Sequence, residues 1–258
     1  MVLPAFDNAL LLLLATIAVA GIARGLSGFG SGMIVAPIAA ALYDPVTAVV
    51  ILVIIDTLPI VPVSLPALKV AHWREVLPVL AGLILFVPLG VYVLKHGDPD
   101  VLRWLICTAI LAGALALWRG WRYRGPRSLP ISLSVGGLAG VLSGIASIPG
   151  PPILVYWLAS ALPAAIVRAN LLALFFLSEF NSIANLWAAG LFEQPRVILG
   201  IVAAPVYFGG LLTGWALYGL SSEAIYRRVT FLLIVGSALV ATPMTSDALN
   251  SLVAGAAG

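Results

Sequence analysis

The chain has 258 residues, of which 62% are hydrophobic and only 9% are charged, and its formal net charge is +3. A soluble domain is about 45–50% apolar and about 25% charged, so this composition excludes a water-soluble globular protein. A nucleic acid-binding protein would need a basic stripe on a soluble face, and the sequence has none. We therefore expect an all-α, polytopic bundle of helices embedded in a lipid bilayer.

Long hydrophobic runs recur along the sequence. A run of about 18 or more apolar residues predicts a helix that crosses the bilayer. The first run is preceded by Asp7 and by no Lys or Arg, whereas a signal peptide begins with positive charge, so we expect this segment to be retained. The runs that reach or approach the required length are residues 9–23, 46–66, 76–94, 101–118, 168–190, 197–220 and 224–241.

The first interruption is rich in glycine and serine. It reads Gly21-Ile-Ala-Arg-Gly-Leu-Ser-Gly-Phe-Gly-Ser-Gly32. We predict that one helix ends here and that a short helix, capped by Gly30 or Ser31, runs on to about residue 43. In lipid, such a break is tolerated only where protein or water satisfies the freed backbone groups. The segment before the break is long enough to cross the membrane or to return as a re-entrant hairpin.

The longest polar interruption lies near the middle of the sequence. It reads Trp118-Arg-Gly-Trp-Arg-Tyr-Arg-Gly-Pro-Arg127. Arginines flanked by tryptophans are typical of a cytoplasmic loop at the membrane interface. We therefore divide the chain into a first repeat at residues 1–118, a basic linker at 119–130 and a second repeat at 131–258.

The two halves resemble each other weakly. Leu26-Ser-Gly-Phe-Gly-Ser31 matches Leu142-Ser-Gly-Ile-Ala-Ser147, and residues 90–103 align without gaps with residues 214–227. Each half is predicted to contain a helix, a break, a short helix and three full spans, and such repeats are typical of transporters. With the linker inside, inverted repeats place far more Lys and Arg residues inside than parallel repeats do, so the positive-inside rule favours inversion.

The chemistry of both breaks suits an anion. A helix that restarts has unpaired N–H groups and a positive dipole end, and Ser147 or Gly150 is expected to cap the second restarting helix near Pro151. Two such ends, with serine hydroxyls and Arg24, predict a small anion site at the membrane midplane. The predicted substrate-binding residues are Arg24, Ser27, Gly28, Gly30, Ser31, Gly32, Ser143, Gly144, Ser147 and Gly150.

Close packing of helices is an alternative explanation for part of the glycine content. Gly21 and Gly25 are four residues apart, as are Gly136, Gly140 and Gly144. Small residues at this spacing let membrane helices approach each other closely. Packing explains the glycines upstream of each break, but it does not readily explain the break Ser147-Ile-Pro-Gly-Pro-Pro152. Both roles can hold at once.

Two acidic residues lie inside apolar runs. Asp56 and Glu179 fall at similar depths in the corresponding span of each half, and charges at bilayer depth are costly and usually functional. They are candidates for proton coupling. The alternatives are that one of them pairs with Arg24, that they hold helices together, or that they coordinate a cation.

Catalytic and metal-binding patterns are missing from the sequence. It has no Ser/His/Asp grouping, no His/Cys metal spacing and no phosphate-binding loop, so we expect no enzyme activity, no cofactor and no bound metal. The single cysteine, Cys107, lies in an apolar run and is expected to be a packing residue. The sequence is compatible with a monomer or with a homo-oligomer.

The two breaks carry a family resemblance. Gly25-Leu-Ser-Gly-Phe-Gly-Ser-Gly-Met33 followed by Pro37, and Leu142-Ser-Gly-Ile-Ala-Ser-Ile-Pro-Gly-Pro-Pro152, resemble the TauE/SafE, or sulfite exporter, family of membrane transporters. The resemblance covers essentially the whole chain, although members typically carry more consecutive glycines after each break. It implies a multi-pass protein of the bacterial inner membrane that exports sulfite or an organosulfonate such as sulfoacetate. An anion channel, or a transporter of another small anion or of a cation, is the alternative.

Overall fold

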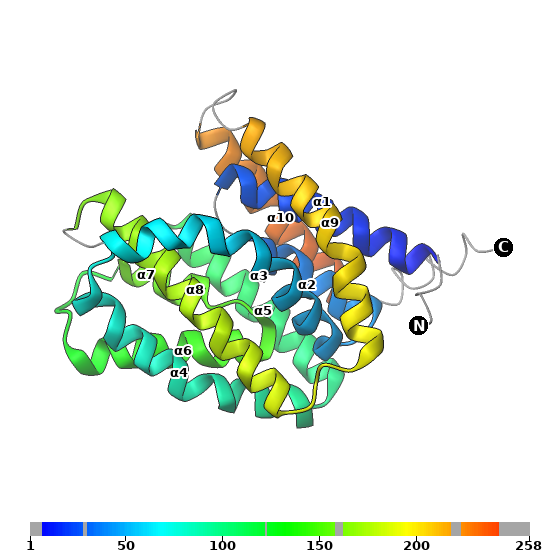
Figure 1. Cartoon of the computed structure of the whole chain (residues 1–258), viewed down its shortest axis with the longest axis horizontal. Helices are drawn as coiled ribbons and strands as arrows, with labels where there is room; N and C mark the ends of the chain where they lie inside the picture. Colours follow the sequence, from blue (N-terminus) through cyan, green and yellow to red (C-terminus); the bar gives the residue numbers. More distant parts are fainter. Residues whose placement is uncertain (1–6, 28–29, 122, 158–161, 218–222, 243–258) are drawn as a thin grey trace. The chain divides into compact units, whose positions relative to one another are not determined.

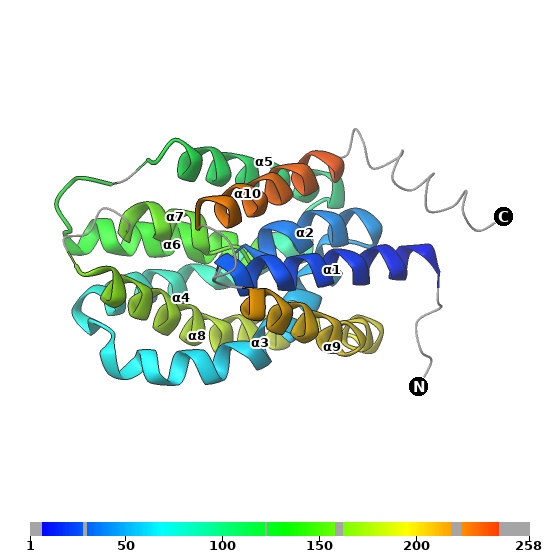
Figure 2. The same cartoon turned by 90° about the horizontal axis from the view of Figure 1, so that it is seen from above.

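A computed structural model describes residues 7–27, 30–121, 123–157, 162–217 and 223–242. These residues form α-helices and connecting turns, and they contain no β-strand (Figures 1 and 2). The helices are α1 (Asn8–Ser27), α2 (Ser31–Leu42), α3 (Pro45–Val70), α4 (Trp73–His96), α5 (Pro99–Trp118), α6 (Leu129–Ala146), α7 (Gly150–Trp157), α8 (Ala164–Ala188), α9 (Gln194–Leu217) and α10 (Glu223–Val240).

The predicted order of elements is confirmed in both halves. A long helix, a break, a short helix and three longer helices follow each other as α1 to α5 and again as α6 to α10. Among the described residues, six helices have the length and apolar composition needed to cross a bilayer, namely α1, α4, α5, α6, α8 and α9. Some side chains within or beside the other two predicted spans lie outside the described part of the chain, namely those of residues 58–60, 62–63 and 218–230.

Contacts divide the chain into two compact units. The first unit comprises Met1–Ile55, Gly97–Ala114 and Phe192–Gly258, and the second comprises Asp56–His96 and Leu115–Leu191. Each unit therefore combines segments from both sides of the linker. These units are defined by contacts and do not test the repeat boundaries proposed from the sequence, which stay a prediction.

In the first unit, α1 lies alongside α9, and α2 packs on α1 and α10 (Figures 1 and 2). Glycines bring the backbones of α1 and α9 together. A Cβ atom on Gly25 would lie 2.8 Å from the Cα of Gly214, and one on Gly21 would lie 2.5 Å from the carbonyl oxygen of Tyr207. Side-chain carbons do not approach backbone atoms so closely, so only glycine fits at these two positions.

In the second unit, the equivalent crossing joins α4 and α6. A Cβ atom on Gly144 would lie 2.7 Å from the carbonyl carbon of Gly90, and one on Gly140 would lie 3.0 Å from the Cα of Leu83. Helices α8 and α7 complete this unit, because α8 packs on α4 and α7 packs on α6. The packing role considered for these glycines is therefore confirmed.

The two crossings refine the alignment of the halves. Gly90 and Gly214, which the sequence aligns, oppose Gly144 and Gly25 respectively. The structure thus pairs Gly25 with Gly144, whereas the match of Leu26–Ser31 with Leu142–Ser147 would pair Gly25 with Val141. The two pairings differ by three residues, and a degenerate Gly-Ser pattern allows either. The relation between the two halves and the inverted orientation of the second both stay predictions.

Candidate functional site

The first break ends where α2 begins. Gly30 has φ 97°, in the left-handed region that favours glycine, and its carbonyl accepts the N–H of Ile34 at 3.2 Å. Ser31 is the first helical residue and is 1% exposed. The first turn of a helix directs its N–H groups outward along the axis, so this buried helix end can bind an anion.

Arg24 spans the first break. From the last turn of α1, its Nη1 donates a hydrogen bond of 2.8 Å to the Oγ of Ser31. The bond brings the Arg24 guanidinium to the N-terminal end of α2. The helix dipole is positive at this end, so two positive charges meet at the start of α2. Charged side chains within membrane spans are costly and usually functional, and Arg24 stays a predicted binding residue.

The second break follows α6. Ser147 has φ 57° and is the only described residue other than glycine with a positive φ. Its N–H donates to the carbonyl of Ser143 at 2.8 Å, and the N–H of Ile148 donates to the carbonyl of Leu142 at 3.4 Å. This is a helix C-cap with serine at the position that usually holds glycine. The expectation that Ser147 caps the following helix is wrong, because its backbone terminates α6.

The second restarting helix offers fewer donors than the first. Helix α7 begins at Gly150, and the next two residues are Pro151 and Pro152, which have no N–H group. A Cβ atom on Gly150 would lie 4.0 Å from the Cζ of Phe175, which is ordinary contact, so the absence of a side chain there is not forced by packing. The prolines fix the start of α7 but weaken it as an anion site.

The other predicted binding residues divide between packing and polar contact. Gly144 packs against α4, so the space where its side chain would be is filled by the neighbouring helix. Gly32 is buried in the first turn of α2. Ser143 is 3% exposed, and its Oγ lies 3.3 Å from the Oγ of Ser182. The side chain of Ser27 and the whole of Gly28 lie outside the described residues.

Sequence reasoning missed two polar residues of the second unit. Ser182 of α8 contacts Ser143 near the end of α6, and the Oγ1 of Thr57 in α3 lies 3.5 Å from the Oε1 of Glu179, at the limit of a hydrogen bond. Ser178 and Ser182 are four residues apart in an apolar span, on either side of Glu179. That spacing places Ser178 and Ser182 on one helix face and is the signal that could have found Ser182.

Polar groups continue along α8 beyond Glu179. The Nδ2 of Asn185 donates to the carbonyl and the side-chain oxygen of Asn181, at 2.8 and 3.1 Å. The Nδ2 of Asn181 is itself buried without a hydrogen-bond partner. Asp56 and Glu179 are both half-buried and belong to the same unit, so α3 and α8 each carry a carboxylate there. Whether either carboxylate pairs with Arg24 stays a prediction.

Other features of the described residues bear on the remaining alternatives. No group of three His, Cys, Asp or Glu residues among them is arranged to hold a metal ion. Cys107 is buried in a cluster with Ile38, Ala41 and Ala241, which confirms its packing role.

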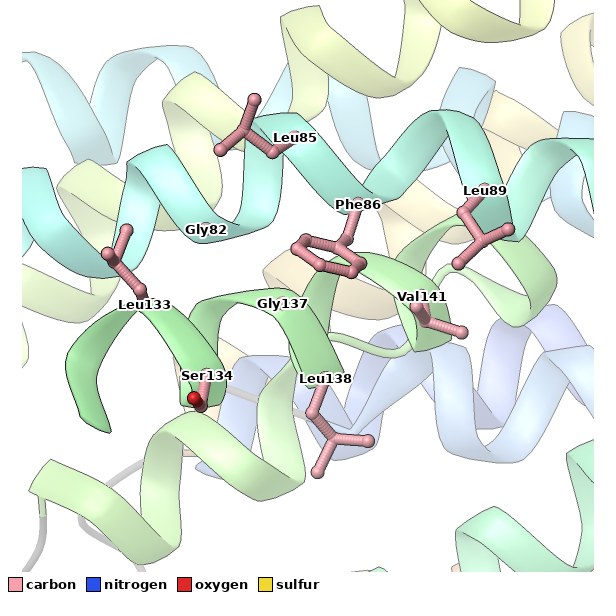
Figure 3. Close-up of a pocket in the computed structure, with 9 residues that line it drawn as sticks. All are labelled: Gly82, Leu85, Phe86, Leu89, Leu133, Ser134, Gly137, Leu138 and Val141. Atoms are coloured by element: carbon pink, nitrogen blue, oxygen red, sulfur yellow. The ribbon is translucent and has the colours of Figure 1, made fainter. Parts of the chain in front are cut away.

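An apolar groove runs over the crossing of α4 and α6 (Figure 3). Its volume is about 340 Å³, and Ser134 provides its one polar side chain. Leu85 and Leu138 border it and are 69% and 55% exposed, as expected of side chains that face lipid. An anion would lose its hydration here without gaining partners, so the groove is not the candidate site. Its lining residues are Gly82, Leu85, Phe86, Leu89, Leu133, Ser134, Gly137, Leu138 and Val141.

In the described part of the chain, six helices suited to crossing a bilayer and two helix breaks, one with a half-buried arginine bonded to a buried serine, are the features of a polytopic membrane transporter. The family model described as sulfite exporter TauE/SafE matches residues 13–241, and the chain belongs to this family. It is similar to a probable sulfite/organosulfonate exporter TauE of Cupriavidus necator, with 28% identity over 218 residues that cover 81% of this chain and 84% of the relative. No solved structure matches the chain.

Family membership confirms the resemblance found in the sequence. The members of this family are transporters and not enzymes, so the chain is a multi-pass bacterial membrane protein that moves a solute. The family also supports an anion as the transported solute.

Proposed function

We propose that this protein is a secondary transporter that exports a small sulfur-containing anion, either sulfite or an organosulfonate such as sulfoacetate, across the bacterial inner membrane. The similarity to a sulfite/organosulfonate exporter supports this choice of substrate. The proton gradient or the membrane potential drives export. A secondary transporter fits a chain without a phosphate-binding loop for ATP.

The observation that carries the proposal is the hydrogen bond between Arg24 and Ser31 across the first break. Sulfite and sulfonates present several oxygen atoms that accept hydrogen bonds. A guanidinium, a hydroxyl and the N–H groups of a helix N-terminus are the donors such oxygens need, and a charge-assisted hydrogen bond contributes about 1.5–3 kcal/mol. When the anion binds, its oxygens accept from the Arg24 guanidinium and the Ser31 hydroxyl, which are hydrogen-bonded to each other in its absence.

Of the two breaks, the first offers an anion more donors. Helix α2 begins with Ser31, Gly32 and Met33, all of which have an N–H group, whereas α7 has prolines at its second and third residues. The second break offers the Ser143 and Ser147 hydroxyls and the N–H of Gly150. Affinity therefore depends more on Arg24 and Ser31 than on the second break.

Asp56 and Glu179 are the proposed proton carriers. Each carboxylate lies in a helix that follows a restarting helix, α3 after α2 and α8 after α7. A carboxylate at membrane depth can take up a proton on one side and release it on the other, which would couple anion export to the proton gradient.

The test is counterflow in proteoliposomes. Vesicles are preloaded with unlabelled sulfite or sulfoacetate, and uptake of the labelled anion is followed for the wild type, for Ser31→Ala and for Ser134→Ala. Ser134 is the matched control because it is an exposed serine in the apolar groove. Its hydroxyl donates to the backbone carbonyl of Pro130, one helical turn earlier, at 2.9 Å. We expect saturable exchange by the wild type and by Ser134→Ala, and a KM raised roughly tenfold by Ser31→Ala.

Three results would change this proposal. An anion flux that does not saturate and shows no counterflow would make the protein a channel. Exchange by Ser31→Ala as tight as that of the wild type would remove the first break from the site. No exchange of either anion by folded wild-type protein would reject the sulfur-containing substrate.

A further inference from the structure

In each of the two short helices that follow a break, a carbonyl of the last turn accepts a hydrogen bond from an arginine. In the first unit, the Nε of Arg103, from α5, donates to the carbonyl of Ala40 in the last turn of α2 at 2.9 Å. In the second unit, the Nη2 of Arg127, from the linker, donates to the carbonyl of Tyr156 in the last turn of α7 at 3.4 Å. The same kind of contact thus occurs independently in both units.

These carbonyls are the ones that a helix leaves unpaired. The last four C=O groups of an α-helix have no partner within the helix, and they carry its negative dipole end. Both arginines are largely buried, with 17% and 20% of their side chains exposed. A guanidinium at this end satisfies a carbonyl and opposes the dipole with one side chain.

Each guanidinium is held in place by a carboxylate. The Nη1 of Arg103 lies 3.4 Å from Asp100, and the Nη1 of Arg127 lies 3.3 Å from Glu75 in the first turn of α4. Because a carboxylate takes one nitrogen and a carbonyl takes another, both contacts use the planar fork that arginine has and lysine lacks.

The contact at α7 is reinforced by its neighbours. The guanidinium of Arg127 lies over the ring of Tyr156, 5.3 Å from its centre, and the Tyr156 hydroxyl lies 2.7 Å from the Oγ of Ser132. The N–H of Tyr123 in the linker donates to the carbonyl of Val155 at 3.0 Å. The C-terminal end of α7 is therefore tied to α4, to α6 and to the linker at once.

Short helices depend on such contacts more than long ones do. Helix α7 has 8 residues and α2 has 12, which at 1.5 Å per residue makes them about 12 and 18 Å long. Helices of this length are marginal on their own, so the surrounding contacts decide where they lie. A short helix that is held at its C-terminal end has less freedom to move at its N-terminal end.

We propose that Arg103 and Arg127 are positioning residues, which hold the C-terminal ends of α2 and α7 and so fix the anion-binding N-terminal ends of these helices. The inference rests on the proposed function for the anion site, and it assigns a role to two arginines that do not touch the anion. The linker is then part of the transport machinery, because it supplies Arg127 and Tyr123.

The experiment compares four variants of the full-length protein, Arg127→Gln, Arg127→Lys, Arg103→Gln and Arg124→Gln. Arg124 is the control because it is an exposed arginine of the same linker. Hydrogen–deuterium exchange of the amides of α2 and α7 is measured in nanodiscs without any anion. Counterflow of labelled sulfite then gives KM and the maximal rate for each variant that elutes as a monodisperse species.

We expect Arg103→Gln to speed amide exchange in α2 and to raise the KM for sulfite roughly tenfold. Arg127→Gln is expected to speed amide exchange in α7 and to raise the KM by a smaller factor, because α7 offers the anion fewer donors. Arg127→Lys is expected to behave like Arg127→Gln, because an ammonium cannot span the carboxylate and the carbonyl. Arg124→Gln is expected to resemble the wild type in both measurements.

The two measurements separate this inference from the proposed function. Amide exchange in α2 and α7 that is the same in Arg103→Gln and Arg127→Gln as in the wild type would overturn the positioning role. Faster exchange in these helices with an unchanged KM would also overturn it, because the held helix ends would not matter for the anion. If wild-type protein transports no sulfite but Arg127→Gln still loosens α7, the proposed substrate fails while the hold on the helix stands.

Discussion

Ser147 adopts a backbone conformation that serine rarely takes. At φ 57° its Cβ atom is crowded, which costs about 1–2 kcal/mol, and glycine would avoid this strain. Strained residues tend to occur at functional sites, where the strain is tolerated because the side chain is needed. The hydroxyl of Ser147, at the second break, is therefore expected to contribute to anion binding even though its backbone caps α6.

Replacing Ser147 by glycine tests this trade-off. Ser147→Gly is expected to stabilise the protein by about 1 kcal/mol, because the left-handed conformation no longer crowds a Cβ atom. The same change is expected to raise the KM for sulfite, because a donor is lost. Thermal unfolding in detergent and counterflow measure the two effects. A more stable protein with an unaltered KM would show that the hydroxyl is not a ligand.

Glu179 is the residue on which proton coupling can be tested most directly. The substitution Glu179→Gln keeps the shape of the side chain but removes its titration, so we expect counterflow to persist while proton-driven export loses its dependence on pH. Glu193→Gln is the control, since Glu193 is 58% exposed in the turn before α9 and pairs with Arg196 at 3.1 Å. A pH profile of Glu179→Gln identical to that of the wild type, together with the same result for Asp56→Asn, would reject the proton-carrier role.

At the scale of the helices, one glycine crossing in each unit determines how two helices approach. Adding a methyl group to Gly25 would force α1 away from α9, so Gly25→Ala is expected to destabilise the protein by about 1–3 kcal/mol. Gly209 lies on α9 with nothing within 4 Å of its would-be Cβ atom. Gly209→Ala is therefore the matched control and is expected to stabilise the helix by up to about 1 kcal/mol.

Thermal unfolding of these two variants in the same detergent gives the comparison. The crossing in the second unit can be tested in the same way with Gly144→Ala, which meets the backbone of Gly90. Equal unfolding temperatures for Gly25→Ala and Gly209→Ala would mean that α1 and α9 are not in the close contact described.

At the scale of the whole molecule, the open question of topology is the orientation of the second repeat. With the linker inside, inverted repeats place Glu193 outside the cell, and parallel repeats place it inside. Ser222, the other informative position, lies outside the described residues. In a Cys107→Ser background, we expect Glu193→Cys to react with an impermeant maleimide from outside and Arg124→Cys to be protected until the membrane is opened.

The reverse labelling of Glu193→Cys would establish parallel repeats. It would leave the helices and their crossings unchanged, because both arrangements have the same ten elements. It would, however, remove the positive-inside argument from which inversion was predicted.

The sequence alone determined the features that depend on local chemistry. Membrane location follows from the length of apolar runs, and the order of helices and breaks follows from where glycine, serine and proline interrupt them. The first break was placed at Gly30 and Ser31 because glycine and serine interrupt the apolar run there. Family membership was also visible in the residues of the two breaks.

Only the tertiary structure decided which side chains meet. Gly144 was expected at the anion site, but it faces α4, and this depends on the approach of a helix more than fifty residues earlier. The contacts of Ser182 and Thr57, and those of Arg103 and Arg127 with helix carbonyls, could not be predicted either, because each joins segments far apart in the sequence. Local patterns specify where a helix begins and ends, whereas the partner of each helix face is decided by packing in three dimensions.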